Sequence, residues 1–417
     1  MDGKIDKNKM VNISFAFCVE IWYNLRQEKP IGKESSDMKR ILLSVLMLGL
    51  LLCGCASESA PKQTTTAGTT TRPPATTVQQ TTTVPPATTV PPTTVPVTTV
   101  PPTTAPVLPY AAPLTGEPLA QPQLQRPIAV MLNNIKDAMP QHGVSQADIL
   151  YEVLAEGGIT RCMGIYGDIS DVEKIGSIRS ARKYYVDLAR GYDAAYVHAG
   201  GSTEASNYLA GLRGMDLDAG LSATCFYRDQ WRLNNGYSIE HTLFSSGEKI
   251  LSFAATRNVS TTLSGEKTYG MTFAEAPEFS GQSGKKMTVY FHLNGSPTGN
   301  TKKTVMTYDP ETGNYDAAQH GGTYVDGNTW KGISFRNVVV LRCATSVQSD
   351  GLRLTVQTTG SGTGYFACDG KMIPIRWSRS SVTEPFRFTT ESGDPVVFGV
   401  GSTYIAVVPN GASVVTE

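Results

Sequence analysis

The Thr/Pro-rich tract at residues 61–109 is the feature that most limits what this chain can fold into. Its later part reads TTTVPPATTVPPTTVPVTTVPPTTAP. Proline fixes φ and has no backbone N–H, so the tract can form neither a helix nor a central strand. Polyproline II is the expected conformation, and at about 3.1 Å per residue the tract would reach up to about 150 Å. We interpret it as a spacer, and such segments are also candidates for O-glycosylation.

The residues before the tract predict export and a lipid anchor. Met38-Lys39-Arg40 is a short basic start, and the apolar run from Ile41 to Leu52 has the length of a signal-peptide core. The run ends in Leu52-Cys53-Gly54-Cys55, which resembles a bacterial lipobox. The resemblance implies cleavage before Cys55 and acylation of its thiol by a diacylglyceryl group, with palmitate as a typical chain. We therefore expect residues 38–54 to be a signal peptide and the mature protein to be extracytoplasmic, held at the cell membrane by lipid.

Residues 1–37 precede this signal and fit poorly with it. We interpret Met38 as the true start and residues 1–37 as a mis-called upstream extension. Residues 55–109 then comprise the acylated cysteine and a disordered tether.

Charge and spacing argue against several functional classes. The chain carries 36 Lys+Arg and 36 Asp+Glu, so it lacks the basic excess of a nucleic-acid-binding protein. The five histidines are scattered and no H-x-x-x-H or C-x-x-C motif occurs after the tether, so no metal or cofactor is expected. Export permits disulfides, and Cys343–Cys368 is the pair to expect if one forms. The alternative is that these cysteines, with Cys162 and Cys225, are buried free thiols.

The folded part predicts two units. RPIAVMLNN, which begins at Arg126, is typical of a buried strand. From residue 285 short runs such as MTVYF, NVVVLRC, GYFAC, KMIPIRW and STYIAVVP alternate with turns, and Asp369-Gly370 is a hairpin signal. We predict an α+β protein, with a mixed α/β unit over residues 120–280 and a mostly-β unit over 285–412.

The stretch DILYEVLAEGGITRCMGIYG predicts a hairpin about a two-residue turn at Gly157–Gly158. In that register Leu154 faces Arg161 and Glu152 lies on the same sheet face as both. Arg161 would then lie diagonally between Glu152 and Glu156. This cluster could do acid/base work, or it could form a structural ion-pair network.

The stretch GSIRSARKYY predicts the start of a helix over residues 181–190, with Ser180 as N-cap and Gly191 as the stop. Arg179 and Arg182 are three residues apart and would share a helical face. Two guanidinium groups beside the free N–H groups of a helix start suit a phosphate or a carboxylate. The alternative is that both arginines pair with carboxylates of the fold.

The stretch YDAAYVHAGGST predicts a strand, a glycine turn and a second helix that begins near Ser202. His198 would end the strand, at the sheet edge where ligands bind in open α/β folds. It could be a general acid/base at neutral pH, or a buried structural histidine. A polar and aromatic loop follows, which includes Glu240 and His241.

Several of these segments together resemble those of a known protein family. RPIAVMLNN, SQADILYEVLAEGGITR, KIGSIRSARKYYVDLARGYDAAYVHAGGS and GSGTGYFACDGKMIPIRWS resemble the YerB-like bacterial lipoproteins, over about residues 120–410. The resemblance implies an α+β N-terminal unit and a β-rich second unit, with no established activity. The sequence departs from the family at GYSIEHTLFSS, where Glu240-His241-Thr242 stands in place of a Pro-His-Asn-like pattern.

These observations predict a lipid-anchored extracytoplasmic protein that binds an anionic wall component or an envelope protein through Arg179, Arg182 and Ser180. One alternative is an envelope hydrolase or transferase that acts on wall polymer, with His198 and the Glu152/Glu156 pair as its acid/base groups. Another is a structural scaffold for a second envelope protein. The sequence leaves open whether the protein is an enzyme.

Overall fold

The computed structural model of the chain describes residues 108–263 and 265–417. The predictions for residues 1–37, the signal peptide, Cys55 and the tether up to residue 107 lie outside the described residues. Within the described part of the chain, no helix is long and apolar enough to cross a membrane.

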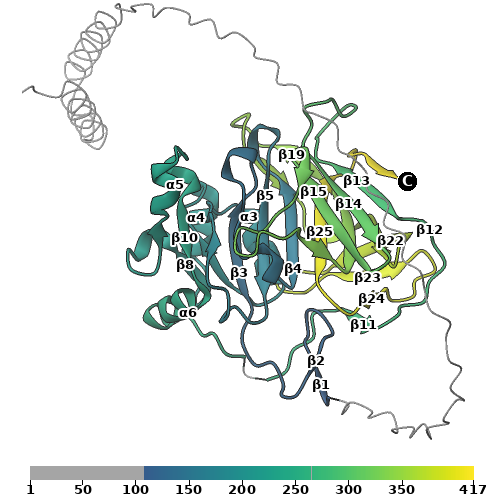
Figure 1. Cartoon of the computed structure of the whole chain (residues 1–417), viewed down its shortest axis with the longest axis horizontal. Coiled ribbons are helices and arrows are strands. Elements are labelled where there is room, and N and C mark those ends of the chain that lie inside the picture. The colour runs from purple at the N-terminus through teal and green to yellow at the C-terminus, as the bar shows by residue number, and fades with distance from the viewer. Residues whose placement is uncertain (1–107, 264) are drawn as a thin grey trace, which may run out of the picture. The chain divides into compact units, whose positions relative to one another are not determined.

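A large sheet runs through the described part of the chain (Figure 1). In spatial order its strands are β12 (Gln282–Ser283), β22 (Lys371–Arg379), β21 (Gly360–Cys368), β18 (Asn337–Cys343), β25 (Thr403–Pro409), β4 (Ile149–Leu154), β5 (Thr160–Tyr166), β3 (Ile128–Asn133), β7 (Ala195–His198) and β8 (Asp216–Asp218), and β23 (Arg387–Thr390) pairs with β22.

Strand β25 joins the two halves of this sheet. It pairs in parallel with β18 on one side and with β4 on the other, where Thr403 lies opposite Ile149 and Val407 opposite Val153. The two segments that the sequence predicts as separate units therefore share one sheet, in which a strand near the C-terminus is the neighbour of a strand near residue 150.

Smaller sheets lie around the large one. One is formed by β16 (Gly322–Thr323), β15 (Asn314–Gln319), β14 (Lys303–Asp309), β13 (Lys286–Tyr290) and β26 (Val414–Thr416), with β17 (Ser334–Phe335) paired to β15. The others are β6 (Ile175–Gly176) with β10 (Leu243–Ser245) and β9 (Tyr227–Arg228), β11 (Thr272–Ala274) with β24 (Val397–Gly399), β1 (Tyr110–Ala111) with β2 (Pro118–Leu119), and β19 (Thr345–Val347) with β20 (Leu354–Val356).

The α-helices of the described residues are α3 (Lys183–Arg190), α4 (Thr203–Ala210), α5 (Gln230–Asn234) and α6 (Gly247–Thr256). Buried residues of α3 and α4 pack into the core on one face of the large sheet, and those of α6 pack into the core on the other face. Strands dominate this fold, so the α+β class holds in its coarse form. The mixed α/β unit over residues 120–280 stays a prediction.

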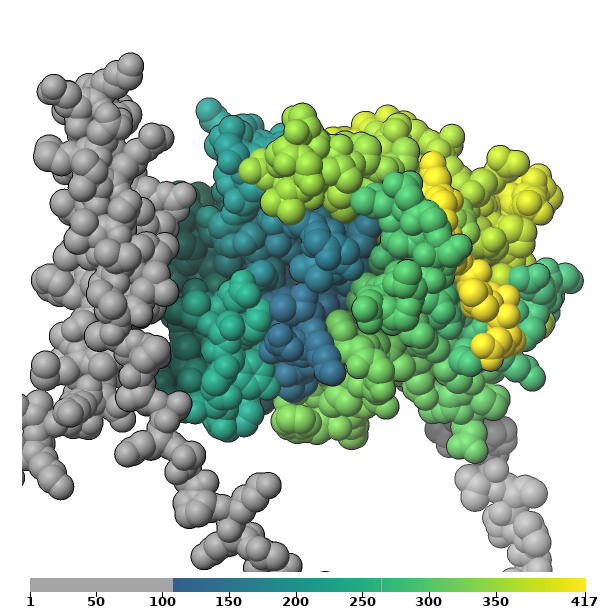
Figure 2. Space-filling model, turned by 90° about the horizontal axis from the view of Figure 1, so that it is seen from above, coloured from purple at the N-terminus to yellow at the C-terminus, as the bar shows by residue number. Residues whose placement is uncertain are grey.

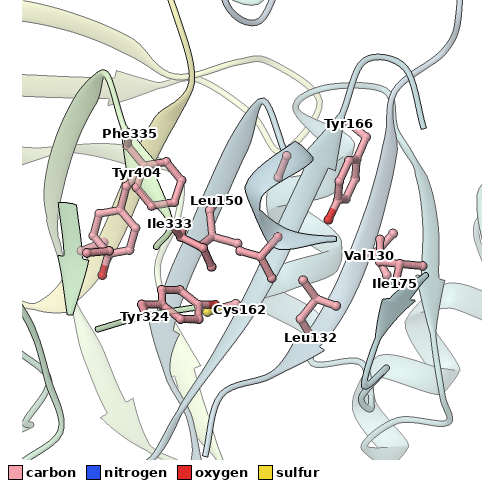
Figure 3. Packing of buried hydrophobic residues seen from close by; sticks show 14 of the residues in the cluster. Val130, Leu132, Leu150, Cys162, Tyr166, Ile175, Tyr324, Ile333, Phe335 and Tyr404 are labelled. Atoms are coloured by element: carbon pink, nitrogen blue, oxygen red, sulfur yellow. The ribbon is translucent and has the colours of Figure 1, made fainter. Parts of the chain in front are cut away.

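Both faces of the central strands are covered. Every residue of β3, β4 and β5 is buried, which explains their nearly unbroken apolar sequences. Figure 3 shows one of the two cores: Tyr404 and Phe335 pack beside Leu150. Alternating residues point to opposite faces of a strand, so neighbours in β4 contribute to different cores.

Several local predictions for the second half of the chain are confirmed. The predicted runs form β13, β18, β21, β22 and β25, and Asp369-Gly370 is a two-residue turn because Cys368 pairs with Lys371. Asp369 and Gly370 both have positive φ, at 50° and 68°, as a type I′ turn requires. The cysteines at 162, 225, 343 and 368 are free, so the pairing of Cys343 with Cys368 is wrong. Three of them are buried free thiols, as the alternative expects, but Cys225 is only partly buried.

The predicted start of the helix after residue 180 is wrong. Helix α3 begins at Lys183, its N-cap position is Arg182, and no side chain caps it. Ser180 therefore does not cap the helix, and Arg179 and Arg182 do not share a helical face. The stop at Gly191 is confirmed.

The predicted register of the β4–β5 hairpin is also wrong. The connection is the loop 155–159, closed by a hydrogen bond from the Ala155 N–H to the Ile159 carbonyl (2.8 Å), and Leu154 pairs with Thr160. Val153 then lies opposite Arg161, and Glu152 lies opposite Cys162. A shift of one residue reverses every side chain of a strand, so Glu152 and Arg161 lie on opposite faces of the sheet.

Candidate functional site

The stretch GSIRSAR runs as an extended segment between two strands at one end of the sheet. The Arg179 N–H donates to the Met131 carbonyl (3.0 Å), and the Arg179 carbonyl accepts from Ala199 (3.0 Å). The Ala181 N–H donates to the Gly200 carbonyl (2.8 Å). Backbone groups that a helix would need are thus bonded to the end of β3 and to the loop after β7, which is why the helix begins later.

Arg182 is held by the β4–β5 loop. Its guanidinium forms a two-pronged ion pair with the Glu156 carboxylate, through Nε to Oε1 and through Nη2 to Oε2 (3.1 Å). Burial by itself would raise the pKa of Glu156, but the hydrogen bond and charge of Arg182 lower it below its usual value. This pair supports the alternative that the sequence left open, in which the arginines bind carboxylates of the fold.

Arg161 lies beside this pair and is incompletely compensated. It is only 6% exposed, its Nη1 donates to the Ser180 carbonyl (2.7 Å), and its Nη2 lies 3.6 Å from Glu156 Oε2, beyond hydrogen-bond distance. Its Nε is buried without a hydrogen-bond partner among the described residues. Burial, and then the neighbouring charge of Arg182, lower the pKa of Arg161. An unpaired donor on a buried cation is costly, so the arrangement favours an additional acceptor.

Arg179 pairs with the loop that departs from the family pattern. Its Nη1 lies 3.1 Å from Glu240 Oε2, and Glu240 is an exposed carboxylate. The next residue, His241, is buried, and its Nδ1 is 2.9 Å from Asn133 Nδ2. Burial lowers the pKa of His241, which favours the neutral ring. This loop therefore lies against Arg179.

We call Arg161, Arg179 and Arg182, with Glu156 and Glu240, the arginine cluster. Three guanidinium groups against two carboxylates leave one positive charge in excess. Figure 2 looks onto this end of the molecule, where the blue residues of the β3 and β4–β5 region lie between teal residues on one side and green residues on the other.

Glu152 does not belong to this cluster. It is 1% exposed and its carboxylate lies 3.2 Å from Lys302 Nζ, just before β14. Its hydrogen-bond donors come from both halves of the chain: Asn134 (3.0 Å), Thr160 (2.6 Å), Thr304 (2.8 Å) and Tyr404 (2.7 Å). Burial would raise the pKa of Glu152, but Lys302 and these hydrogen bonds lower it. The predicted group of Glu152, Glu156 and Arg161 is therefore divided between two faces.

His198 ends β7, as predicted, and Ser202 caps α4 by accepting from the Ala205 N–H (3.2 Å). Both ring nitrogens of His198 face acceptors: Nε2 lies 2.8 Å from Asp216 Oδ1, and Nδ1 lies 2.8 Å from the Gly200 carbonyl. Burial lowers the pKa of His198, but these two hydrogen bonds outweigh it and raise the pKa above its usual value. Two acceptors around the ring favour its protonated form, which has no free lone pair for use as a base.

No group of three His, Cys, Asp or Glu residues suited to a metal ion occurs in the described ranges. Sequence reasoning missed three contacts: Lys302 with Glu152, Asn133 with His241, and Glu240 with Arg179. Lys302 follows Thr301 in a polar run with no motif, so no local signal marked it. The polar loop around Glu240 and His241 was a signal, but its position beside Arg179 depends on the fold.

Comparisons with family models and with known proteins identify the same family for both halves of the chain. Residues 114–260 match the family model described as "Protein of unknown function (DUF3048) N-terminal domain", and residues 296–405 match the corresponding C-terminal domain. The chain belongs to this two-part family. A YerB-like relative of Bacillus subtilis (strain 168), described as "Putative lipoprotein YerB", is 27% identical over 305 residues, which cover 72% of this chain and 86% of the relative.

A solved structure of the YerB-like family agrees with the fold. The crystal structure of YerB protein from Bacillus subtilis matches with a TM-score of 0.64 and 25% identity, and the match covers 74% of this chain and all of that one. The relative is described as a lipoprotein, which agrees with the class of protein that the leader predicts. The family is described as one of unknown function, so a function must be argued from the site itself.

Proposed function

We propose that the protein is a lipid-anchored extracytoplasmic binding protein whose arginine cluster binds an anionic group, a phosphate or a carboxylate. The observation that carries the proposal is Arg161: a buried guanidinium whose Nε–H has no partner among the described residues and whose ion-pair partner, Glu156, lies 3.6 Å away, beyond hydrogen-bond distance. An anion beside Arg179 and Arg182 would supply the missing negative charge. Arginine suits this task because its planar guanidinium matches carboxylate and phosphate oxygens.

The envelope hydrolase or transferase gains no support from the groups on which it depended. Its acid/base candidates were His198 and the Glu152/Glu156 pair. His198 is bonded at both nitrogens, Glu152 is sealed on the opposite face of the sheet, and Glu156 is bonded to Arg182. Binding needs none of these groups to transfer a proton.

Anchoring through Cys55 is part of the same proposal. It rests on the lipobox-like sequence and on the relative that is described as a lipoprotein. Metabolic labelling with palmitate should label the wild-type protein and place it in the membrane fraction. Cys55→Ala should lose the label and leave the membrane fraction, and a labelled or membrane-bound Cys55→Ala protein would contradict the anchor.

Calorimetric titration of the full-length protein in detergent with inorganic phosphate tests the anion site. Arg179→Gln is the informative variant, because Arg179 pairs only with an exposed carboxylate and the fold should survive its loss. We expect phosphate affinity to fall about tenfold, which corresponds to about 1.4 kcal/mol for one lost charged contact. Arg353→Gln is the matched control, since Arg353 also pairs with a single exposed aspartate, Asp350. Equal affinities in all three proteins would refute the site.

A further inference from the structure

A pocket of about 490 Å³ opens beside the arginine cluster, on the other side of the β4–β5 loop. Ala155, Gly157 and Gly158 line it, whereas the side chain of the intervening Glu156 is bonded to Arg182 in the cluster. The pocket wall and the cluster are thus one to two residues apart along the chain, a distance of roughly 7 Å. A single extended ligand could occupy both.

Apart from His292 and Lys302, no ionisable side chain of the described residues lines the pocket. Short polar side chains of the β13–β14 connection line part of the pocket, namely Thr298, Asn300 and Thr301. Aliphatic side chains line another part, including Val347 and Leu352 of the β19–β20 hairpin, and Leu352 is 59% exposed. Lys302 also lines the pocket, but its ammonium is bonded to the buried Glu152.

A lining that combines neutral hydrogen-bonding groups with aliphatic groups fits a sugar ring, which presents hydroxyl groups at its edge and C–H groups on its faces. The volume lies within the usual range of pockets for small ligands. A carboxylate or phosphate has no counter-charge inside the pocket and would remain on the arginines.

We propose that the pocket and the arginine cluster form one extended site for an anionic oligosaccharide. The phosphate or carboxylate of the ligand binds the arginines, a neutral sugar unit occupies the pocket, and the chain between them crosses Gly157–Gly158. This inference rests on the proposed function and names the class of its ligand.

The loop that the ligand crosses is open. A Cβ atom added at Gly157 or Gly158 would meet nothing within 4 Å, so the bare backbone leaves space above it.

Calorimetry on the full-length protein in detergent tests the proposal with four probes: inorganic phosphate, neutral disaccharides, the same disaccharides carrying a phosphate, and an acidic hexapeptide. The disaccharides include glucose, galactose and N-acetylglucosamine units. We expect at least one phosphorylated disaccharide to bind about tenfold more tightly than phosphate, because two linked contacts act together. If phosphate binds and no phosphorylated disaccharide binds better, or only the hexapeptide does, the extended site is wrong. If phosphate does not bind, the proposed function itself fails.

Two variants test whether the neutral sugar unit of the ligand binds in the pocket. Gly157 has φ 71° and ψ 17°, a conformation that asparagine tolerates, so Gly157→Asn should fold and place a side chain across the path of the ligand. It should reduce the affinity ratio of phosphorylated disaccharide to phosphate to near one, and Asn300→Ala should reduce the same ratio about threefold. Gly214→Asn is the control, because Gly214 also has a positive φ, 69°, and open space around it. An unchanged ratio in both Gly157→Asn and Asn300→Ala would overturn the proposal.

Discussion

Two glutamates four residues apart, Glu152 and Glu156, come to opposite roles in this protein. Glu152 is buried between the large sheet and the sheet that contains β14, where four hydrogen-bond donors and Lys302 surround it. Glu156 lies in the β4–β5 loop at the end of the sheet, where two arginines share its carboxylate.

The difference is one of charge balance. Around Glu152 one carboxylate meets one ammonium, and the remaining lone pairs are bonded, so nothing is left for a ligand. Around Glu156 positive charge is in excess and a buried N–H of Arg161 lacks a partner. Removing one partner of a saturated buried pair leaves an uncompensated buried charge, whereas an unsaturated cluster at the edge of the fold can bind an anion.

The largest expected effect comes from breaking the saturated pair. Glu152→Ala leaves Lys302 buried without its counter-ion, so we expect the free energy of unfolding to fall by about 3–5 kcal/mol. Urea unfolding followed by tryptophan fluorescence measures it. Glu311→Ala, at an exposed position, should change the free energy by less than about 0.5 kcal/mol. A loss at Glu152 as small as that at Glu311 would show that the two glutamates do not differ as described.

Removing the charge of Glu156 should lower the stability of the fold but strengthen phosphate binding. Glu156→Gln should lower the free energy of unfolding by about 1 kcal/mol, because the ion pair with Arg182 is only partly buried. It should also raise phosphate affinity about fivefold, since one repelling charge at close range corresponds to about 1 kcal/mol. Calorimetry and urea unfolding on the same variant measure both. Weaker phosphate binding in Glu156→Gln would contradict the charge-balance argument.

Substitution of Gly157 in the β4–β5 loop should have a smaller effect on the free energy of unfolding. Gly157→Ala forces a side chain into the left-handed region, and since its Cβ would meet no other atom, the cost is conformational and about 1 kcal/mol. Gly370→Ala should cost more, because there the added Cβ would also lie 2.8 Å from the Tyr308 ring. Urea unfolding of both variants orders them, and a larger loss at Gly157 than at Gly370 would contradict the open loop.

The smallest effect concerns His198 and His241. The pKa of His198 is raised above 6.5 and that of His241 is lowered below it, so an NMR titration should resolve them on either side of that value. Because the folded pKa of His198 is raised, its contribution to stability is fully present below about pH 6.5 and is lost as the pH rises through the folded pKa. The stability difference between wild type and His198→Gln should therefore shrink at alkaline pH. A difference that grows with pH would contradict the raised pKa of His198.

The two predicted two-residue turns show what local sequence can and cannot predict. Asp369-Gly370 and Gly157–Gly158 carry similar signals, yet only the first forms the tight turn. At the second the chain uses a five-residue loop, and the register moves by one residue. Local sequence could not predict that shift, because the register buries every residue of both strands against distant segments, and it lets Glu152 reach Lys302, 150 positions away in the sequence.

The arginines illustrate the same limit. Their number and spacing indicated an anion site, but the helix on which the argument rested begins three residues after Ser180. Arg179 and Arg182 are brought together by an extended segment bonded to β3 and to the loop after β7. Arg161 joins them from another strand.

By itself the sequence determined the local features that the structure confirms: most strands of the second half, the Asp369-Gly370 turn and the helix stop at Gly191. These depend on the covalent geometry and the periodicity of a few adjacent residues. Only the tertiary structure decided that β25 pairs with β4, that Glu152 and Glu156 face different surroundings, and that three arginines converge. Those outcomes depend on burial and on charge pairing between distant segments, and no local pattern records which segments will meet.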